Sequence, residues 1–367
     1  MAVVDLRSNC RPEGIEKMTA GILCVLVLSL AIAWPACRVQ AESGSTGDEG
    51  VRDTQTLVVS SYADSGPGSL RAALEQASEF SRTYRIGFGS AEGPFSVPRV
   101  IELSSPLPVI QAEVEIDGFI SGLLWKAYGA TVSGNDQFRV FEVAPGGLLR
   151  IAGITVANGH ANSGAGILNH GRLVIEGVTL LENHATKAGG AVANQGGEAY
   201  VINSTAYRNS ADKGGAVANL AGRLRLTNVT LHQNQAATGS AVFSLGPLVL
   251  NNSILTGEGT KCVNRGELVE SRHNLFSTSE GCGEAIISAD PHLGALNYYN
   301  GPTRTLSISS RSPARNLGDN AAAIDHAGNP LKWDQRGNGD PRFTRGYVDI
   351  GALEHQSKLP TEHVVDT

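Results

Sequence analysis

The sequence has few cysteines, few aromatic residues and no excess of positive charge. Of its 367 residues only 5 are cysteine, aromatic side chains make up 5% and charged ones 17%, and 29 Lys and Arg stand against 35 Asp and Glu. A net charge of -6 leaves no basic surface for a phosphate backbone, which excludes nucleic acid as the expected partner. The scarcity of rings also argues against a cleft lined with sugar-stacking aromatics.

Carboxylates are scarce in the middle of the chain. Enzymes that cleave acidic polysaccharides need clustered carboxylates for calcium or for acid–base chemistry, or a basic residue beside a charge-neutralising partner. Residues 147–246 contain a single aspartate, Asp212, and glutamates only at non-equivalent repeat positions, Glu176, Glu182 and Glu198. This composition favours a non-catalytic protein.

The N-terminal region carries one long apolar run, "AGILCVLVLSLAIAW" at 20–34, which is shorter than the roughly 20 residues of a membrane-spanning helix. Basic residues precede the run and a small-residue site at 39–41 follows it, as in a secretory signal peptide. We expect 1–41 to be removed, leaving no stable membrane span, and 42–56 to be a disordered linker. An uncleaved membrane anchor is the alternative. The expected location is secreted, periplasmic or on the surface of a bacterium.

Removal of the signal would leave two cysteines, Cys262 and Cys282. An even pair in an exported chain favours a disulfide, here closing a loop of about 20 residues and worth roughly 3 kcal/mol. No histidine lies at zinc-ligand spacing beside them, so we expect no metal at this pair. Two free thiols are the alternative.

A glycine-rich phrase occurs twice, as "AGGAVANQGG" at 188–197 and "KGGAVANLAG" at 213–222. Around it, five apolar segments align with equivalent residues 24, 26, 25 and 24 positions apart: Ile151, Ile175, Val201, Leu226 and Leu250. Period-2 alternation broken by Gly and Asn indicates three short strands in each copy, with no room for a helix. The sequence therefore predicts an all-β fold, a right-handed parallel β-helix with coils of about 25 residues.

Two columns of asparagine follow from this alignment. We expect Asn169, Asn194 and Asn219 to form one ladder, continued by Ser244, and Asn158, Asn183, Asn209 and Asn234 to form another at a corner with left-handed backbone. Stacked amides satisfy one another, so both ladders are expected to be scaffold rather than a binding site.

A solenoid needs its ends covered, because a terminal coil exposes strand edges and an apolar core. In 57–90, Ser69 is a good N-cap for a short helix with Leu70, Ala73, Leu74 and Ala77 on one face. We assign 57–90 to an N-terminal cap, 91–270 to coils, 271–356 to the last coils and an irregular C-terminal cap, and 357–367 to a flexible tail, all within one domain.

One edge of the coils collects titratable residues. The loops after the asparagine corner contain His160, His184, Lys187, Asp212 and Lys213. Such a set can bind a uronate or take a proton beside its carboxylate, and these residues are the candidate catalytic site. A solvated corner is the simpler explanation for these charges.

The C-terminal segment also concentrates charge, in Trp333, Asp334, Arg336, Asp340, Arg342 and Asp349. We expect charged pairs that seal the final coil. Asp340 in "NGDP" is a candidate ligand for calcium, and no other cofactor is expected.

Several phrases resemble known families. "GGAV" at 189–192 and 214–217 is similar to the repeats of chlamydial polymorphic outer-membrane proteins. The C-terminal third resembles bacterial choice-of-anchor Q domain proteins in an ordered series: "HNLFSTSEGCG" (273–283), "DPHLGAL" (290–296), "NGPTRTLSI" (300–308), "SPARNLGD" (312–319), "DQRGNGDPR" (334–342) and "DIGALE" (349–354). The resemblance implies export, a right-handed β-helix and a cell-surface or extracellular role, but no activity.

Three functions remain open. The favoured one is a secreted, non-catalytic β-helix protein in adhesion or glycan contact, a monomer whose partner is a polysaccharide or another surface component. The alternatives are a polysaccharide lyase or glycoside hydrolase acting on an acidic polysaccharide, and a structural envelope or matrix protein.

Overall fold

The computed structural model describes residues 53–79, 82–89, 97–119, 128–343 and 346–355. The expected signal peptide and tail lie outside these residues, as does the linker up to residue 52. Strand β1 begins at Thr54, so regular structure starts inside the segment 42–56 that we expected to be a linker. In the part of the chain that the structure describes, no helix is long and apolar enough to cross a bilayer.

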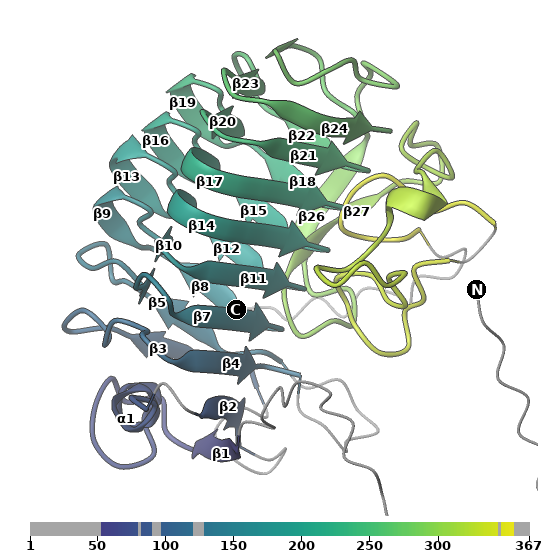
Figure 1. Ribbon diagram of the computed structural model, residues 1–367. Coiled ribbons are helices and arrows are strands. Elements are labelled where there is room, and N and C mark those ends of the chain that lie inside the picture. Colours follow the sequence, from purple (N-terminus) through teal and green to yellow (C-terminus); the bar gives the residue numbers. More distant parts are fainter. Residues whose placement is uncertain (1–52, 80–81, 90–96, 120–127, 344–345, 356–367) are drawn as a thin grey trace, which may run out of the picture. The chain divides into compact units, whose positions relative to one another are not determined.

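Nearly all the regular structure is parallel β-strand, stacked coil upon coil (Figure 1). The largest sheet, sheet A, contains β1 (Thr54–Val59), β2 (Thr83–Phe88), β4 (Glu113–Asp117), β6 (Phe141–Val143), β7 (Leu148–Ala152), β10 (Ile167–Asn169), β11 (Arg172–Glu176), β14 (Val192–Ile202), β17 (Val217–Thr227), β20 (Val242–Ser244), β21 (Leu248–Asn251), β23 (Cys262–Asn264), β24 (Leu268–Arg272) and β25 (Ser279–Glu280).

Two smaller sheets complete the coils, sheet C in only four of them. Sheet B contains β3 (Val100–Glu102), β5 (Thr131–Ser133), β8 (Thr155–Ala157), β12 (Thr179–Leu181), β15 (Thr205–Tyr207), β18 (Thr230–His232) and β22 (Ile254–Thr256). Sheet C contains β9 (His160–Ser163), β13 (His184–Ala188), β16 (Ser210–Lys213) and β19 (Gln235–Thr238). A separate antiparallel pair, β26 (Leu293–Asn297) and β27 (Thr305–Ile308), precedes the 3-10 turn η1 (Asn320–Ala322).

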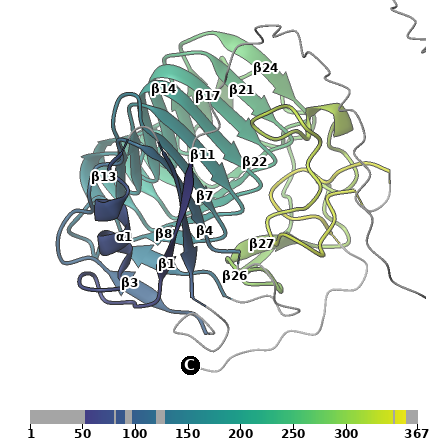
Figure 2. The same ribbon diagram turned by 60° about the horizontal axis from the view of Figure 1, so that its bottom comes forward.

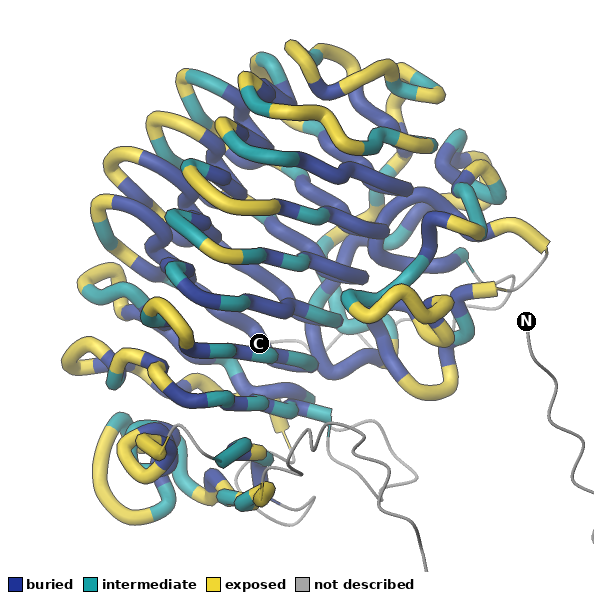
Figure 3. Tube along the Cα trace, viewed as in Figure 1, coloured by how far each residue is buried: buried dark blue, intermediate teal, exposed yellow. Residues whose placement is uncertain are grey.

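Equivalent residues of successive coils are neighbours across the strands, as the alignment predicts. Ile151 pairs with Ile175, which pairs with Val201, and the column continues through Leu226 to Leu250. The parallel β-helix with coils of about 25 residues is therefore confirmed. The inward columns are buried, whereas most residues of the sheet C strands are exposed or half-buried (Figure 3).

Helix α1 (Leu70–Gln76) closes the N-terminal end of the apolar core and contacts β1 (Figure 2). Ser69 is its N-cap, and its hydroxyl accepts a hydrogen bond from the Ala72 amide at 3.1 Å. Leu70, Ala73 and Leu74 are buried against the first coils. The cap helix was thus readable from one capping residue and one apolar face.

The first asparagine ladder runs up the bend of sheet A. Asn169 Nδ2 donates to Asn194 Oδ1 at 2.7 Å, Asn194 Nδ2 to Asn219 Oδ1 at 2.9 Å, and Asn219 Nδ2 to Ser244 Oγ at 3.1 Å. All four side chains are fully buried, and each amide also bonds a backbone carbonyl. Their hydrogen-bonding capacity is used within the scaffold.

The second ladder differs from the prediction at its first member. Asn183 Nδ2 donates to Asn209 Oδ1 and Asn209 Nδ2 to Asn234 Oδ1, both at 2.9 Å, but Asn183 Oδ1 accepts from the Gly159 amide. Asn158 is one residue out of register. It belongs to the left-handed column, with φ near 50°, that continues through Glu182, Arg208 and Gln233, so the left-handed residue precedes the ladder position rather than occupying it.

A third asparagine column, which the sequence analysis missed, holds the C-terminal segment (290–343 and 346–355). Asn203, Asn228 and Asn252 are left-handed, and their Nδ2 atoms donate to the carbonyls of Trp333 (2.8 Å), Asp349 (3.3 Å) and Asp319 (2.9 Å). This segment therefore lies along the side of the coils, against sheet B (Figure 1).

The threonines of sheet B complete this contact. Thr205 Oγ1 donates to Gln335 Oε1 at 2.6 Å, and Thr230 Oγ1 accepts from the Ala352 amide at 3.0 Å. Both threonines are buried, although their alternation in sequence suggests a solvent-facing row. The segment was expected to seal the final coil; instead it covers the polar side of sheet B, because those hydroxyls and amides need partners once water is excluded.

The last coil is closed by the disulfide. Cys262 continues the inward column of Val192, Val217 and Val242, and Cys282 bonds to it from the following loop. Both cysteines are fully buried and lie in the main apolar cluster with Phe276. The predicted pairing is confirmed.

Candidate functional site

A cleft follows the exposed corner at which sheet B turns into sheet C. Two adjoining hollows of about 740 and 670 Å³ share Ser210, Asn234, Gln235 and Glu258, and together form one groove that we call the corner cleft. Its polar lining includes His184, Arg208, Ser210, His232, Gln235 and Glu258. The left-handed residues at each turn let the chain leave sheet B sharply, so successive coils present their side chains side by side.

One column in this corner begins with histidine. His160 pairs with His184, then Ser210, then Gln235 across sheet C. The two imidazole rings lie 5.3 Å apart, and His184 Nδ1 is 2.7 Å from Ser210 Oγ. The column offers imidazole, hydroxyl and amide groups in turn along the coil axis, which suits a ligand with repeated hydroxyls.

A second column supplies aromatic faces. Tyr207 and His232 stack with ring centroids 5.7 Å apart and planes at 25°, and the Arg208 guanidinium carbon lies 4.9 Å from the tyrosine centroid. Burial lowers the pKa of His232, with the Asp290 carboxylate opposing the shift, so the imidazole is neutral at pH 7. His232 and Arg208 line the corner cleft, and the Tyr207 ring packs against both of them without being part of the lining.

The five predicted catalytic residues do not meet at one point. His184 and Asp212 line the corner cleft and His160 stacks on His184. Lys187 and Lys213 are absent from the lining of the cleft, and the Lys213 ammonium lies 5.7 Å from the Phe243 ring. In the described residues no cluster of three or more metal-ligating side chains is present. The five residues are therefore not gathered into one site.

The sequence analysis missed Arg208, His232, Gln235 and Glu258. Each of the four is itself left-handed or lies within two residues of a residue with positive φ. Its place in the cleft therefore depends on the geometry of the turn. An exact alignment of the turns would have shown that these residues share one edge.

No family model, curated protein or solved structure matches this chain.

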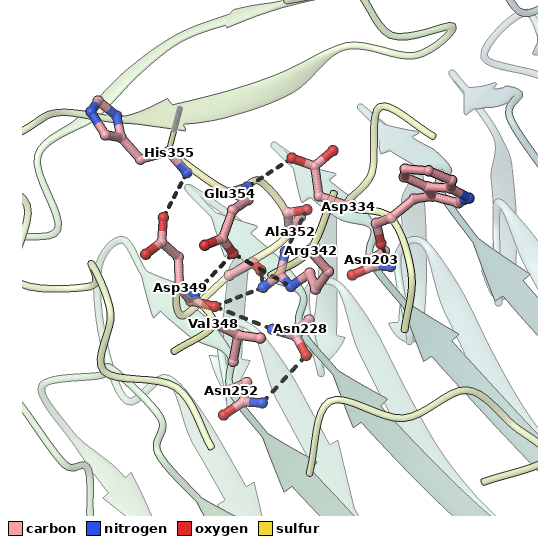
Figure 4. Close-up of polar contacts among 12 residues, drawn as sticks. Asn203, Asn228, Asn252, Asp334, Arg342, Val348, Asp349, Ala352, Glu354 and His355 are labelled. Carbon is pink, nitrogen blue, oxygen red and sulfur yellow. Dashed lines mark hydrogen bonds and ion pairs between the residues drawn. The ribbon is translucent and has the colours of Figure 1, made fainter. Parts of the chain in front are cut away.

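Six charged residues of the C-terminal segment form a buried network: Asp334, Arg336, Asp340, Arg342, Asp349 and Glu354. Figure 4 shows the part of it around Arg342, Asp349 and Glu354. The Arg336 guanidinium contacts Asp334 Oδ2 at 2.5 Å and lies 3.3 Å from Asp340 Oδ1. Arg342 donates to the carbonyls of Asp349 (2.7 Å) and Gly351 (2.6 Å). A guanidinium beside the Asp340 carboxylate does not suit calcium, and the network holds the segment together.

Carboxylates in this network are shifted toward the protonated form. Burial raises the pKa of Glu354 to about 7, with the Arg342 guanidinium opposing and the Asp349 carboxylate adding to the rise. Burial likewise raises the pKa of Asp349. Glu354 Oε2 accepts from the Asp349 amide at 3.0 Å, so its side chain stays in place in either protonation state.

We expect Glu354→Gln to flatten the dependence of stability on pH. Between its ordinary pKa of 4.5 and about 7 the folded protein binds more protons than the unfolded chain, so stability falls as pH rises through this range. Glutamine resembles the protonated acid and removes that fall. The difference between the melting temperatures at pH 5 and pH 8 should be smaller by a few degrees in the variant. The control Glu284→Gln, at an exposed position, should melt as the wild type does at both pH values. The same pH dependence of the melting temperature in all three proteins would contradict the raised pKa of Glu354.

Proposed function

We propose that this protein is a secreted, non-catalytic β-helix protein of the bacterial surface or extracellular space that binds a polysaccharide in the corner cleft. The observation that carries the proposal is the register of the cleft. Each coil adds one further polar or aromatic side chain to the same edge, so the cleft repeats along the coil axis. A polymer whose units repeat can contact several coils at once, which multiplies weak contacts.

The chemistry of the lining supports a glycan. The imidazole rings of His184 and His232, together with hydroxyls and amides, are suited to sugar faces and sugar hydroxyls. Arg208 adds a positive charge, and its ion pair with Glu182 is 3.7 Å long and exposed to solvent. The resemblance of the C-terminal phrases to choice-of-anchor Q domain proteins supports export and a surface role.

Polymer binding tests the proposal. Purified protein is mixed with alginate, pectin, chondroitin and a neutral glucan, with and without calcium, and both co-elution and polymer length are followed by chromatography. One polymer should co-elute without becoming shorter. Shortening would instead favour the lyase or hydrolase, and His184→Ala with Lys187→Ala would then test the predicted catalytic residues; neither effect would leave the structural role.

We expect Tyr207→Ala to weaken binding of that polymer by about tenfold, because Tyr207 is outside the lining but its ring packs against His232 and Arg208, which line the corner cleft. The matched control is Tyr347→Ala, since Tyr347 is 62% exposed and lies in the C-terminal segment away from the corner cleft. Affinity electrophoresis of the three proteins measures the effect. Equal affinities for all three would remove the corner cleft as the binding site.

A further inference from the structure

A third hollow adjoins the corner cleft on the side of the C-terminal segment. It has a volume of about 530 Å³ and is reached through His232 and Gly257, which also line the corner cleft. Its floor is formed over the buried Leu255 and Leu275, and its sides carry the half-buried Leu293 and the hydroxyls of Thr256, Ser277 and Ser288. A concave site of this size with apolar walls and a few polar groups is typical of a small-ligand site. We call it the end cleft.

Lys261 lines the end cleft at a position where the preceding coils have no charge. The register places Ala191, Ala216 and Ala241 directly below it, one in each preceding coil. The alanines belong to the apolar core. The column therefore changes from a small apolar side chain to a long charged one at Lys261.

The lysine is buried and lacks a counter-charge. Lys261 is only 5% exposed, and its ammonium donates to the carbonyl of Gly259. Among the described residues no carboxylate lies within ion-pair distance of it, and Glu258 acts on it only from further away. Burial lowers the pKa of Lys261, with Glu258 opposing the shift. A buried cation without an anion is costly, so this position favours a ligand that brings one.

The one acidic residue of the end cleft does not fill that role. Asp290 lies at the rim with its side chain 76% exposed, and its Oδ1 accepts a hydrogen bond from the His292 amide at 2.8 Å. The inner part of the cleft therefore keeps an ammonium, hydroxyls and apolar walls.

We propose that the end cleft binds a carboxylate-bearing sugar unit, with its carboxylate on the Lys261 ammonium and its hydroxyls on Thr256, Ser277 and Ser288. The inference rests on the proposed function, since the end cleft would hold one acidic unit of the polymer that lies in the corner cleft. It narrows the polymer to one that contains uronate units.

The test uses the monosaccharide galacturonate as probe, with galactose as its uncharged counterpart and acetate as the free carboxylate. Isothermal titration of the full chain should show galacturonate binding at least tenfold more tightly than either comparison compound. Lys261→Met should lose this preference, whereas Lys332→Met, the same change at an exposed lysine, should keep it. Acetate binding as tightly as galacturonate, or unchanged binding by Lys261→Met, would overturn the proposal.

A stability measurement separates binding from folding. Without ligand, Lys261→Met should melt above the wild type, because an unpaired buried charge is replaced by an apolar side chain of similar length. In the wild type, the side-chain NMR resonances of Lys261 should shift when galacturonate is added and should not shift when galactose is added. This measurement does not depend on the folding of any variant. If Tyr207→Ala weakens polymer binding and Lys261→Met does not, the corner cleft stands and the end cleft fails.

Discussion

Arg336→Met should destabilise the protein by about 3–5 kcal/mol and release the C-terminal segment from sheet B. The guanidinium is 1% exposed, donates to both oxygens of Asp334 at 3.0 and 3.1 Å through Nε, and donates to the Glu354 carbonyl at 2.9 Å. Its removal leaves the Asp334 carboxylate buried without its cation. Such an uncompensated charge costs far more than the intact pair contributes.

Urea unfolding and amide hydrogen exchange would measure this effect. Exchange should accelerate first in 331–354 and in the Asn203 and Thr205 region that the segment covers, with the coils near the N-terminal cap unaffected. Arg336→Lys keeps the charge and should lose less, and Arg311→Met removes an exposed arginine and should change little. A variant with normal stability would mean that the aspartates are protonated or hydrated once the arginine is gone.

Removing the disulfide should cost about 3 kcal/mol, through Cys262→Ala with Cys282→Ala or through a reductant. The two residues are 20 apart in sequence, so the bond limits the freedom of a loop that would otherwise open the end of the core. In a solenoid each coil contacts only its neighbours, so the loss should stay near the end of the stack. Thermal melting and hydrogen exchange of 262–282 would measure it.

The double variant provides its own control, because a reductant should not lower its melting temperature further. Coils at 167–201 should keep their exchange rates in both proteins. A uniform rise in exchange along all coils would contradict the local role of the disulfide, and an unchanged melting temperature would contradict its contribution to stability.

Much of the scaffold could be predicted because it repeats. The column from Ile151 to Leu250 fixes the coil length, and each asparagine of the first ladder reappears one coil later, so local spacing alone sets the register. The prediction of the second ladder was wrong only at Asn158. The spacing to the next coil is 24 residues there rather than 25, so Asn158 occupies the left-handed position before the ladder. A periodic pattern can place a column of residues, but a single-residue shift at a turn is invisible in it.

The candidate site was only partly predictable. The sequence singled out the edge with His160 and His184, but it also included Lys187 and Lys213, which lie outside the corner cleft. Arg208 and His232 were missed because their proximity to Tyr207 arises from stacking between coils. Charge and residue type identify the edge of the coils that carries polar side chains. The conformation of the turns decides which of these side chains line the corner cleft.

The sequence by itself determined the β-helix, its coil length, the helical N-terminal cap and the Cys262–Cys282 bond, since each depends on spacing over a few tens of residues. Only the tertiary structure decided where the C-terminal segment lies and which residues form the two clefts. Asn203 and Trp333 are 130 residues apart, and Thr205 and Gln335 are as distant. No local pattern encodes such contacts; they follow from the demand that the buried amides and hydroxyls of sheet B find partners.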